Sequence, residues 1–265
     1  MNTVKTFWWL VLLLIGVPCS LSAEETASAN GKWLMMVMTR STDATREADF
    51  NHWYDDIDIP DVLQVPGYKR ARRGHRVESA DLPPAVDDDG TYVALYDIVT
   101  RNMDKTIIEM LMASRKMETV GRSTPLLKVT DRLYFQQHGE TVEASTPPRS
   151  GKKTFLLLER VDCCRDAATG ERLDDWYDVR HIHDMLQTPG FVRATRYELY
   201  RVLMVEPKSA PRYLTVYEVN ADSAEQVVAA RRATLQRLSA QGRISELFVE
   251  RGTALFQQIN DVPAQ

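Results

Sequence analysis

The chain has 265 residues and a formal net charge of −4 at pH 7, and 44% of its residues are hydrophobic and 26% charged. That is the composition of a globular protein, and the lack of a basic excess argues against nucleic acid or an anionic membrane surface as a partner. We therefore expect neither of these as a partner.

The N-terminus predicts an export signal. Lys5 precedes an apolar run over residues 7–17, which is shorter than the about 20 apolar residues that span a bilayer. Small residues follow, and we expect cleavage after Ser22 or Ala23, so that residues 1–23 are a signal peptide and the mature protein is soluble, periplasmic or secreted. An uncleaved anchor, or a lipoprotein acylated at Cys19, is the alternative.

The rest of the chain contains an internal duplication. Residues 53–73 and 176–196 align without a gap at an offset of 123 (176 − 53), and twelve of these 21 positions are identical. Three shorter pairs of segments match at an offset of 121: 92–98 with 213–219, 133–137 with 254–258, and 33–37 with 154–158. A period near 120 is too long for a solenoid repeat, so each copy is expected to be a small module.

Each copy predicts the order strand, helix, strand, strand, helix, strand, from short apolar runs for the strands and a helical period for the helices. In the first module, residues 32–143, the elements are expected at 33–38, 48–64, 68–77, 91–99, 103–117 and 132–137. In the second module, residues 153–260, they are expected at 154–160, 171–187, 191–205, 212–219, 221–241 and 253–259. Residues 162–170 read as a loop and residues 144–152 as the linker between modules. The last helix is expected to begin at Asp222 or Ser223, which are good N-caps.

This order is that of the ferredoxin-like βαββαβ unit, an α+β fold. A four-stranded sheet with helices on one face leaves its other face bare, and two such sheets can cover each other. We therefore predict two tandem ferredoxin-like modules that pack sheet to sheet across a pseudo-twofold axis, as an intramolecular α+β barrel. The linker should remain exposed.

The duplicated block WY-x(3)-H-x-P-D-x-L-x(2)-PG-[FY] resembles the EthD-like family of the dimeric α+β barrel superfamily, and the resemblance covers both copies. It implies a ligand cavity between sheet and helices, lined in part by a histidine on the helix. The superfamily contains cofactor-free oxygenases, cyclases, isomerases, haem-dependent enzymes and proteins of no known activity, so the resemblance implies a fold more than a function.

Neither copy keeps the whole family pattern. The first copy has Pro60 but carries Asp58 where the pattern has histidine. The second copy has His181 but carries His183 where the pattern has proline. Acid–base chemistry through this helix is therefore expected only in the second copy.

The helix of the second copy supplies the candidate catalytic residues His181, Tyr177 and Asp178. Tyr177 lies four residues before His181, and Asp178 and Asp184 each lie three residues from it, so that either carboxylate could orient the imidazole or raise its pKa. Trp176, Asp184 and Arg196 are the candidate ligand-binding residues. The alternative is a scaffold role, in which the aromatic residues and His181 pack the helix on the sheet and the arginines after the turn pair with helix carboxylates.

We expect no cofactor and no metal. His181 and His183 do not share a helical face, and the acidic turn at residues 87–90 lacks the rest of a calcium-ligand series. No paired CxxC motif is present. Cys163 and Cys164 read either as two thiols in a turn, as a strained vicinal disulfide, or as an intermolecular bridge.

Two functions fit these residues, and both suit a monomer or a homodimer. The first is a cofactor-independent isomerase, cyclase or related acid–base enzyme on an aromatic or polyketide-like substrate, with His181 as base and Tyr177 as donor to a developing enolate. The second is a non-catalytic extracytoplasmic binding protein for a small hydrophobic ligand. The Tyr, Asp and His on one helix favour the enzyme, whereas the divergence of both motifs favours the binding protein.

Overall fold

The computed structural model describes residues 30–82, 90–145, 151–163, 166–203 and 210–265. The predicted signal peptide, most of the acidic turn at residues 87–90 and most of the linker lie outside the described residues. Among the residues described, no helix is long and apolar enough to cross a membrane.

Each copy forms the predicted series of elements. The first copy contains β1 (Gly31–Ser41), the 3-10 turn η1 (Ala44–Arg46), α1 (Glu47–Trp53), the π-helical segment η2 (Tyr54–Asp58), α2 (Ile59–Val62), β2 (Tyr68–Val77), β3 (Tyr92–Thr100), α3 (Met103–Thr119) and β4 (Leu127–Glu143). The second contains β5 (Lys153–Asp162), α4 (Ala167–Trp176), the π-helical segment η3 (Tyr177–His181), α5 (Ile182–Met185), β6 (Phe191–Leu203), β7 (Tyr213–Ala221), α6 (Ala224–Ala240) and β8 (Val249–Pro263).

Two helices of the second copy start at side-chain caps. The Ser223 side chain accepts a hydrogen bond from the backbone N–H of Gln226, which confirms one of the two predicted starts of α6. The prediction of a loop through residue 170 was wrong, because Asp166 accepts from the N–H of Thr169 at 2.9 Å and starts α4 at Ala167.

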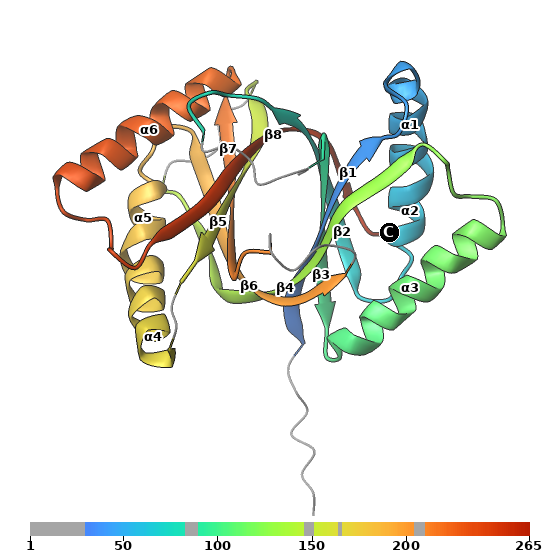
Figure 1. The fold of residues 1–265 in the computed structure, drawn as a ribbon, viewed down its shortest axis with the longest axis horizontal. Helices are drawn as coiled ribbons and strands as arrows, with labels where there is room; N and C mark the ends of the chain where they lie inside the picture. The colour runs from blue at the N-terminus through green and yellow to red at the C-terminus, as the bar shows by residue number, and fades with distance from the viewer. Residues whose placement is uncertain (1–29, 83–89, 146–150, 164–165, 204–209) are drawn as a thin grey trace, which may run out of the picture.

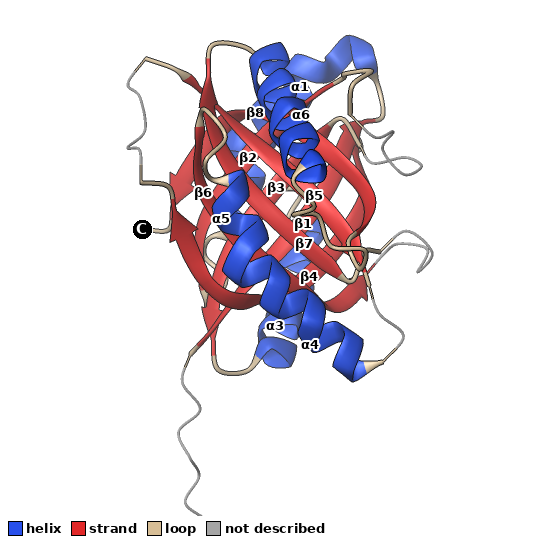
Figure 2. Cartoon of the chain, turned by 90° about the vertical axis from the view of Figure 1, so that its left-hand side faces the viewer, coloured by secondary structure: helices blue, strands red, loops and turns tan. Residues whose placement is uncertain are grey.

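The eight strands close into one antiparallel barrel in the order β1-β3-β2-β8-β5-β7-β6-β4. Each copy contributes a four-stranded sheet, and the sheets join edge to edge where β2 pairs with β8 and β4 pairs with β6. The helices of the two copies cover opposite outer sides of the barrel (Figure 1), and the view in Figure 2 looks onto those of the second copy. A closed barrel leaves no sheet edge unpaired, which accounts for the length of β4 and β8 beyond the predicted strands.

The interior of the barrel confirms that the two copies cover each other. Its apolar cluster takes side chains from both sheets: Leu34, Met36, Met38, Val93, Leu95, Leu133 and Phe135 from the first copy, and Leu156, Leu158, Tyr197, Leu214, Val216, Ala254 and Phe256 from the second. Two further clusters lie between each sheet and its helices. The fold is thus an α+β barrel made within one chain.

The strand pairing corrects the alignment of β1 with β5 by one residue. Met35 pairs with Tyr96, and Leu157 pairs with Tyr217, which is the equivalent of Tyr96 at the offset of 121. The offset between β1 and β5 is therefore 122 (157 − 35), not 121. Because side chains alternate along a strand, this shift moves each residue to the opposite face of the sheet. Glu159 consequently matches Val37 and faces the helices rather than the barrel interior.

Cys163, the residue directly after β5, is disulfide-bonded. The interpretation as free thiols is therefore wrong for Cys163. Its partner lies outside the described residues.

Candidate functional site

The duplicated block forms a helix that is interrupted by one π-helical turn in each copy, at Tyr54–Asp58 and at Tyr177–His181. Such a turn inserts an extra residue into an α-helix, and π-turns are common at functional sites. In the second copy it places Tyr177 and His181 together on the buried side, facing the sheet. The fold therefore brings these two predicted residues together, as the sequence spacing indicated.

Glu159 of β5, which is not among the predicted site residues, is the centre of a buried polar cluster. The Tyr177 hydroxyl donates to Glu159 Oε1 over 2.6 Å, and His181 Nε2 lies 3.3 Å from the same oxygen. Thr215 Oγ1 lies 2.7 Å from the Tyr177 oxygen and donates to it, because the one hydroxyl proton of Tyr177 is directed to Glu159. The Glu159 and His181 side chains are both completely shielded from solvent.

Arg231 of α6 completes this cluster from the opposite helix. One of its guanidinium nitrogens lies 2.9 Å from Glu159 Oε2 and 2.8 Å from Glu250 Oε1. Arg231 lies on the buried side of α6 with Val227 and Val228. An arginine within an apolar helix face, like a glutamate within an apolar strand, was the sequence signal that could have identified this cluster, because such charges are rarely buried without a partner.

The electrostatics of the cluster fix the protonation state of Glu159. Burial opposes ionisation, but the hydrogen bond with His181, together with Arg231 and Tyr177, lowers the pKa of Glu159 to about 2. Burial, and secondarily the negative charge of Glu159, raise the pKa of Tyr177 well above its ordinary value. Glu159 is therefore an anion that accepts hydrogen bonds, and Tyr177 is a neutral donor.

An ionised carboxylate can only accept, so a neutral His181 carries its proton on Nε2, toward Glu159. Its Nδ1 is buried and has no hydrogen-bond partner among the described residues. The imidazole is enclosed by the rings of Trp176, Tyr177 and Phe248, with centroid distances of 4.8, 4.7 and 5.1 Å. The arrangement is a carboxylate-oriented histidine whose second nitrogen is a free acceptor, as a general base requires.

The first copy does not contain this cluster. The counterpart of His181 is Asp58. The other three counterparts are apolar: Val37 for Glu159, Ala94 for Thr215 and Met110 for Arg231. Asp58 accepts from the Tyr96 hydroxyl at 3.3 Å, and burial raises its pKa to about 6. The second copy alone thus joins a histidine, a carboxylate and an arginine.

The carboxylates expected to orient His181 have other partners. Asp178 accepts from Arg196 at 3.1 Å and lies 3.4 Å from His138 Nε2, which belongs to β4 of the first copy. Asp184 accepts two hydrogen bonds from Arg243, each of 2.8 Å. Glu159 therefore takes the orienting position that the helix spacing assigned to these two residues.

The remaining predicted residues make contacts that both copies share. Arg196 is buried and pairs with Asp178, as buried Arg73 pairs with Asp55 in the first copy, both at 3.1 Å. The Trp176 indole donates to the backbone oxygen of Arg243 at 2.9 Å, and the equivalent contact in the first copy, from Trp53 to Arg122, is 2.7 Å. These duplicated contacts hold the helix on the barrel in each copy.

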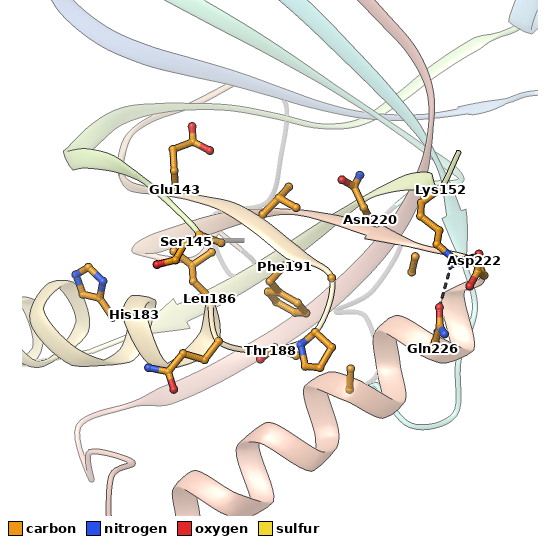
Figure 3. A pocket seen from close by; sticks show the side chains of 17 residues that line it. Glu143, Ser145, Lys152, His183, Leu186, Thr188, Phe191, Asn220, Asp222 and Gln226 are labelled. Carbon is orange, nitrogen blue, oxygen red and sulfur yellow. Dashed lines mark hydrogen bonds and ion pairs between the residues drawn. The ribbon is translucent and has the colours of Figure 1, made fainter. Parts of the chain in front are cut away.

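A separate cavity of about 660 Å³ lies beside the turn between α5 and β6. Figure 3 shows Phe191 at its centre, with Thr188 below it and Lys152 directed toward Asp222 at the start of α6. Asn220 and Gln226 add amide groups to the wall. The volume and the mixed lining suit a small molecule with an apolar body and polar ends.

A smaller cavity of about 420 Å³ lies between α2 and α3 of the first copy. Neither cavity is lined by His181. Within the described ranges, no group of three or more His, Cys, Asp or Glu side chains is arranged to hold a metal ion.

Comparison with solved structures supports the fold. An anthrone oxidase-like protein superposes with a TM-score of 0.53 and 14% sequence identity, over 90% of this chain and 95% of that chain. A proposed monooxygenase from Fusobacterium nucleatum subsp. nucleatum gives a TM-score of 0.51 and 8% identity, over 88% of this chain and 94% of that chain. No protein-family model and no curated protein matches the chain. The chain therefore shares the barrel fold of these structures, with both halves of the barrel in one polypeptide.

Proposed function

We propose that the protein is an exported acid–base enzyme that acts on a small aromatic or polyketide-like carbonyl compound, with His181 as its base. The observation that carries this proposal is the buried pair of His181 and Glu159, with His181 Nδ1 free to accept a proton. Burying an ionised carboxylate is costly even when it is paired. The first copy forms the same fold with Val37 in place of Glu159, so the fold itself does not require this charge.

The proposed step is a proton transfer. His181 Nδ1 removes a proton from the carbon next to a carbonyl, the ring becomes an imidazolium, and Glu159 stabilises that cation. Returning the proton to another atom of the enolate gives an isomer without any cofactor. Because the proton of Tyr177 is directed to Glu159, we now assign Tyr177 to positioning the carboxylate rather than to donating to the enolate.

The resemblance to the EthD-like family supports a site between the helix and the sheet. The name of one comparison structure, an anthrone oxidase-like protein, supports a small aromatic substrate. Since the His181 side chain is fully enclosed, a substrate reaches Nδ1 only if the partly exposed Trp176 or Phe248 moves aside.

The test is deuterium exchange, followed by NMR, at the carbon next to the carbonyl in a panel of aromatic ketones. We expect exchange with the wild-type protein and a loss of about 10²–10⁴-fold in His181→Gln. Asp58→Asn, at the matched position of the first copy, should retain the wild-type rate. Exchange that is unchanged in folded His181→Gln would refute the proposed base.

The second candidate is a non-catalytic binding protein that uses the 660 Å³ cavity, because that cavity is open whereas His181 is enclosed. Gln187→Trp would fill this cavity, and Gln64→Trp is the matched control in the smaller cavity. Ligand binding that is lost only in Gln187→Trp and survives in His181→Gln would favour this candidate over the enzyme.

Export is part of the proposal. It is supported by the short apolar run after Lys5 and by the small residues that follow it. N-terminal sequencing of protein from the native host should begin at Ala23 or Glu24. Recovery of Met1, or retention in the membrane after a high-salt wash, would contradict export with cleavage.

A further inference from the structure

Helix α3 exposes an unusual amount of apolar surface. Half of the large hydrophobic side chains that are exposed in the described part of the chain lie on α3 or directly after it: Ile108, Leu111, Met112 and Val120. Met112 is the most open of the four, with 68% of its surface exposed. Clusters of this kind on a soluble protein mark interaction sites more often than isolated apolar residues do.

The exposed residues follow a helical spacing and form one stripe. Ile108, Leu111 and Met112 lie three and four residues apart and so share a face of the helix. The opposite face of α3 is already used, since Met103, Ile107 and Met110 are buried against the sheet. The stripe is therefore not required to hold α3 on the barrel.

The duplicated helix α6 provides an internal comparison. At the offset of 121, the counterparts of Ile108, Leu111 and Met112 are Ala229, Arg232 and Ala233. The α6 helix thus occupies the same place in the fold without large apolar residues on its outer face. The stripe belongs to α3 alone.

We propose that the outer face of α3 binds the same face of a second copy of this chain and forms a twofold-symmetric dimer. A symmetric interface has to be complementary to itself. An antiparallel pair of α3 helices, centred between Glu109 and Met110, places Ile108 against Leu111 of the second copy. Because of the twofold axis this contact occurs twice.

Charges at the two ends of the stripe are complementary in the same register. Asp104, in the first turn of α3, comes opposite Arg115 of the second copy, and the twofold axis repeats this pair. The exposed Asp104 carboxylate is already bound at Oδ1 within its own chain, by the Tyr200 hydroxyl at 2.9 Å and by Arg201 in an ion pair of 2.8 Å, so Arg115 of a second copy would pair with the other carboxylate oxygen. This complementarity favours a second copy over a lipid surface, which would not select an acidic and a basic end.

The test is sedimentation velocity on the purified full-length protein over a wide concentration range. The double variant Leu111→Arg/Met112→Ala gives α3 the residues that α6 has at these two positions. We expect the wild-type protein to form a dimer and the dissociation constant of that dimer to rise about tenfold or more in the double variant. This corresponds to a loss of about 1.4 kcal/mol or more in binding free energy. Arg115→Glu should also weaken the dimer, and the effect should shrink at high salt.

Val179→Lys, at an exposed apolar residue on the other side of the barrel, is the matched control and should leave the dimer unchanged. Circular dichroism should show that all variants fold. A wild-type protein that remains monomeric throughout, whether or not it binds lipid vesicles, would overturn the proposal. So would a dimer with the same dissociation constant in the double variant.

Discussion

Glu159 and His181 meet with Oε1 and Nε2 3.3 Å apart, and neither side chain is exposed to solvent. Glu159 lies on β5 and His181 on η3, and the two residues are 22 positions apart in sequence. Val37 and Asp58 occupy the same two positions in the first copy. One chain thus contains two versions of the same structural position, one with a carboxylate–histidine pair and one without, and each version is a reference for the other.

The buried charges of the second copy should stabilise the fold only as a pair. Glu159→Val and Arg231→Met introduce the residues that the first copy has at these positions. Each single variant leaves one buried charge without one of its charged partners, and we expect it to lower the free energy of unfolding by about 3–5 kcal/mol. The double variant should cost much less than the sum of the two, because both charges are removed. Urea denaturation of the four proteins measures this coupling, and strictly additive losses would contradict it.

Glu159 and Asp58 should give stability opposite dependences on pH. The folded pKa of Glu159 is lowered from 4.5 to about 2, so its contribution is present above pH 4.5 and is lost as the pH falls toward 2. The folded pKa of Asp58 is raised from 3.8 to about 6, so its contribution is present below pH 3.8 and is lost as the pH rises through 6.

Unfolding measured across this pH range should separate the two residues. Asp58→Asn should remove the loss of stability between pH 3.8 and 6 and be more stable than wild type at neutral pH. Glu159→Gln should instead flatten the curve at low pH. Variants with the same pH profile as the wild type would show that these carboxylates do not titrate as described.

The duplication allowed most of the fold to be predicted, but two features depended on pairing that the sequence does not show. The offset between β1 and β5 was one residue in error, because Leu and Met runs on strands that are buried on both faces fit either register. The joining of sheet edges through β4 and β8 depends on contacts between residues far apart in the chain.

Only part of the candidate site could be predicted, because its residues also come from elements far apart in the chain. His181 and Tyr177 were found because they lie on one helix within a duplicated block. Their partners Glu159 and Arg231 come from a strand and from the other helix, so no local spacing links them to His181. Asp178 and Asp184 had the right spacing but are held by Arg196 and Arg243.

Arg196 and Arg73 should have equal structural importance. Each is buried, pairs with a helix carboxylate and lies over a tyrosine ring of its helix, at 4.5 Å for Tyr177 and 4.4 Å for Tyr54. We expect Arg196→Leu and Arg73→Leu each to lower the free energy of unfolding by about 3–5 kcal/mol, because each removes the buried arginine that pairs with a partly buried helix carboxylate. Chemical denaturation compares them. A much smaller loss for Arg196→Leu, together with weaker ligand binding, would assign Arg196 to the ligand rather than to the scaffold.

Phe248 should control access to His181. Its ring lies 5.1 Å from the imidazole and is partly exposed, and the corresponding residue of the first copy is Leu127. Phe248→Ala should let diethyl pyrocarbonate modify His181 faster, by about tenfold or more, because the shielding ring is removed. Peptide mapping measures the rate at His181, with exposed His52 as the internal control. An unchanged rate at His181 would place the entrance elsewhere.

The most direct test of the central claim is to identify, by native mass spectrometry, which small molecules remain bound to the purified protein, and to repeat the measurement with His181→Ala and Asp58→Ala. Both variants should first be shown to fold. If function resides in the second copy, a ligand bound to the wild-type protein should persist in Asp58→Ala and bind more weakly, by about tenfold or more, in His181→Ala. Equal losses in the two variants, or full retention in His181→Ala, would contradict the account and make the duplicated helix a scaffold.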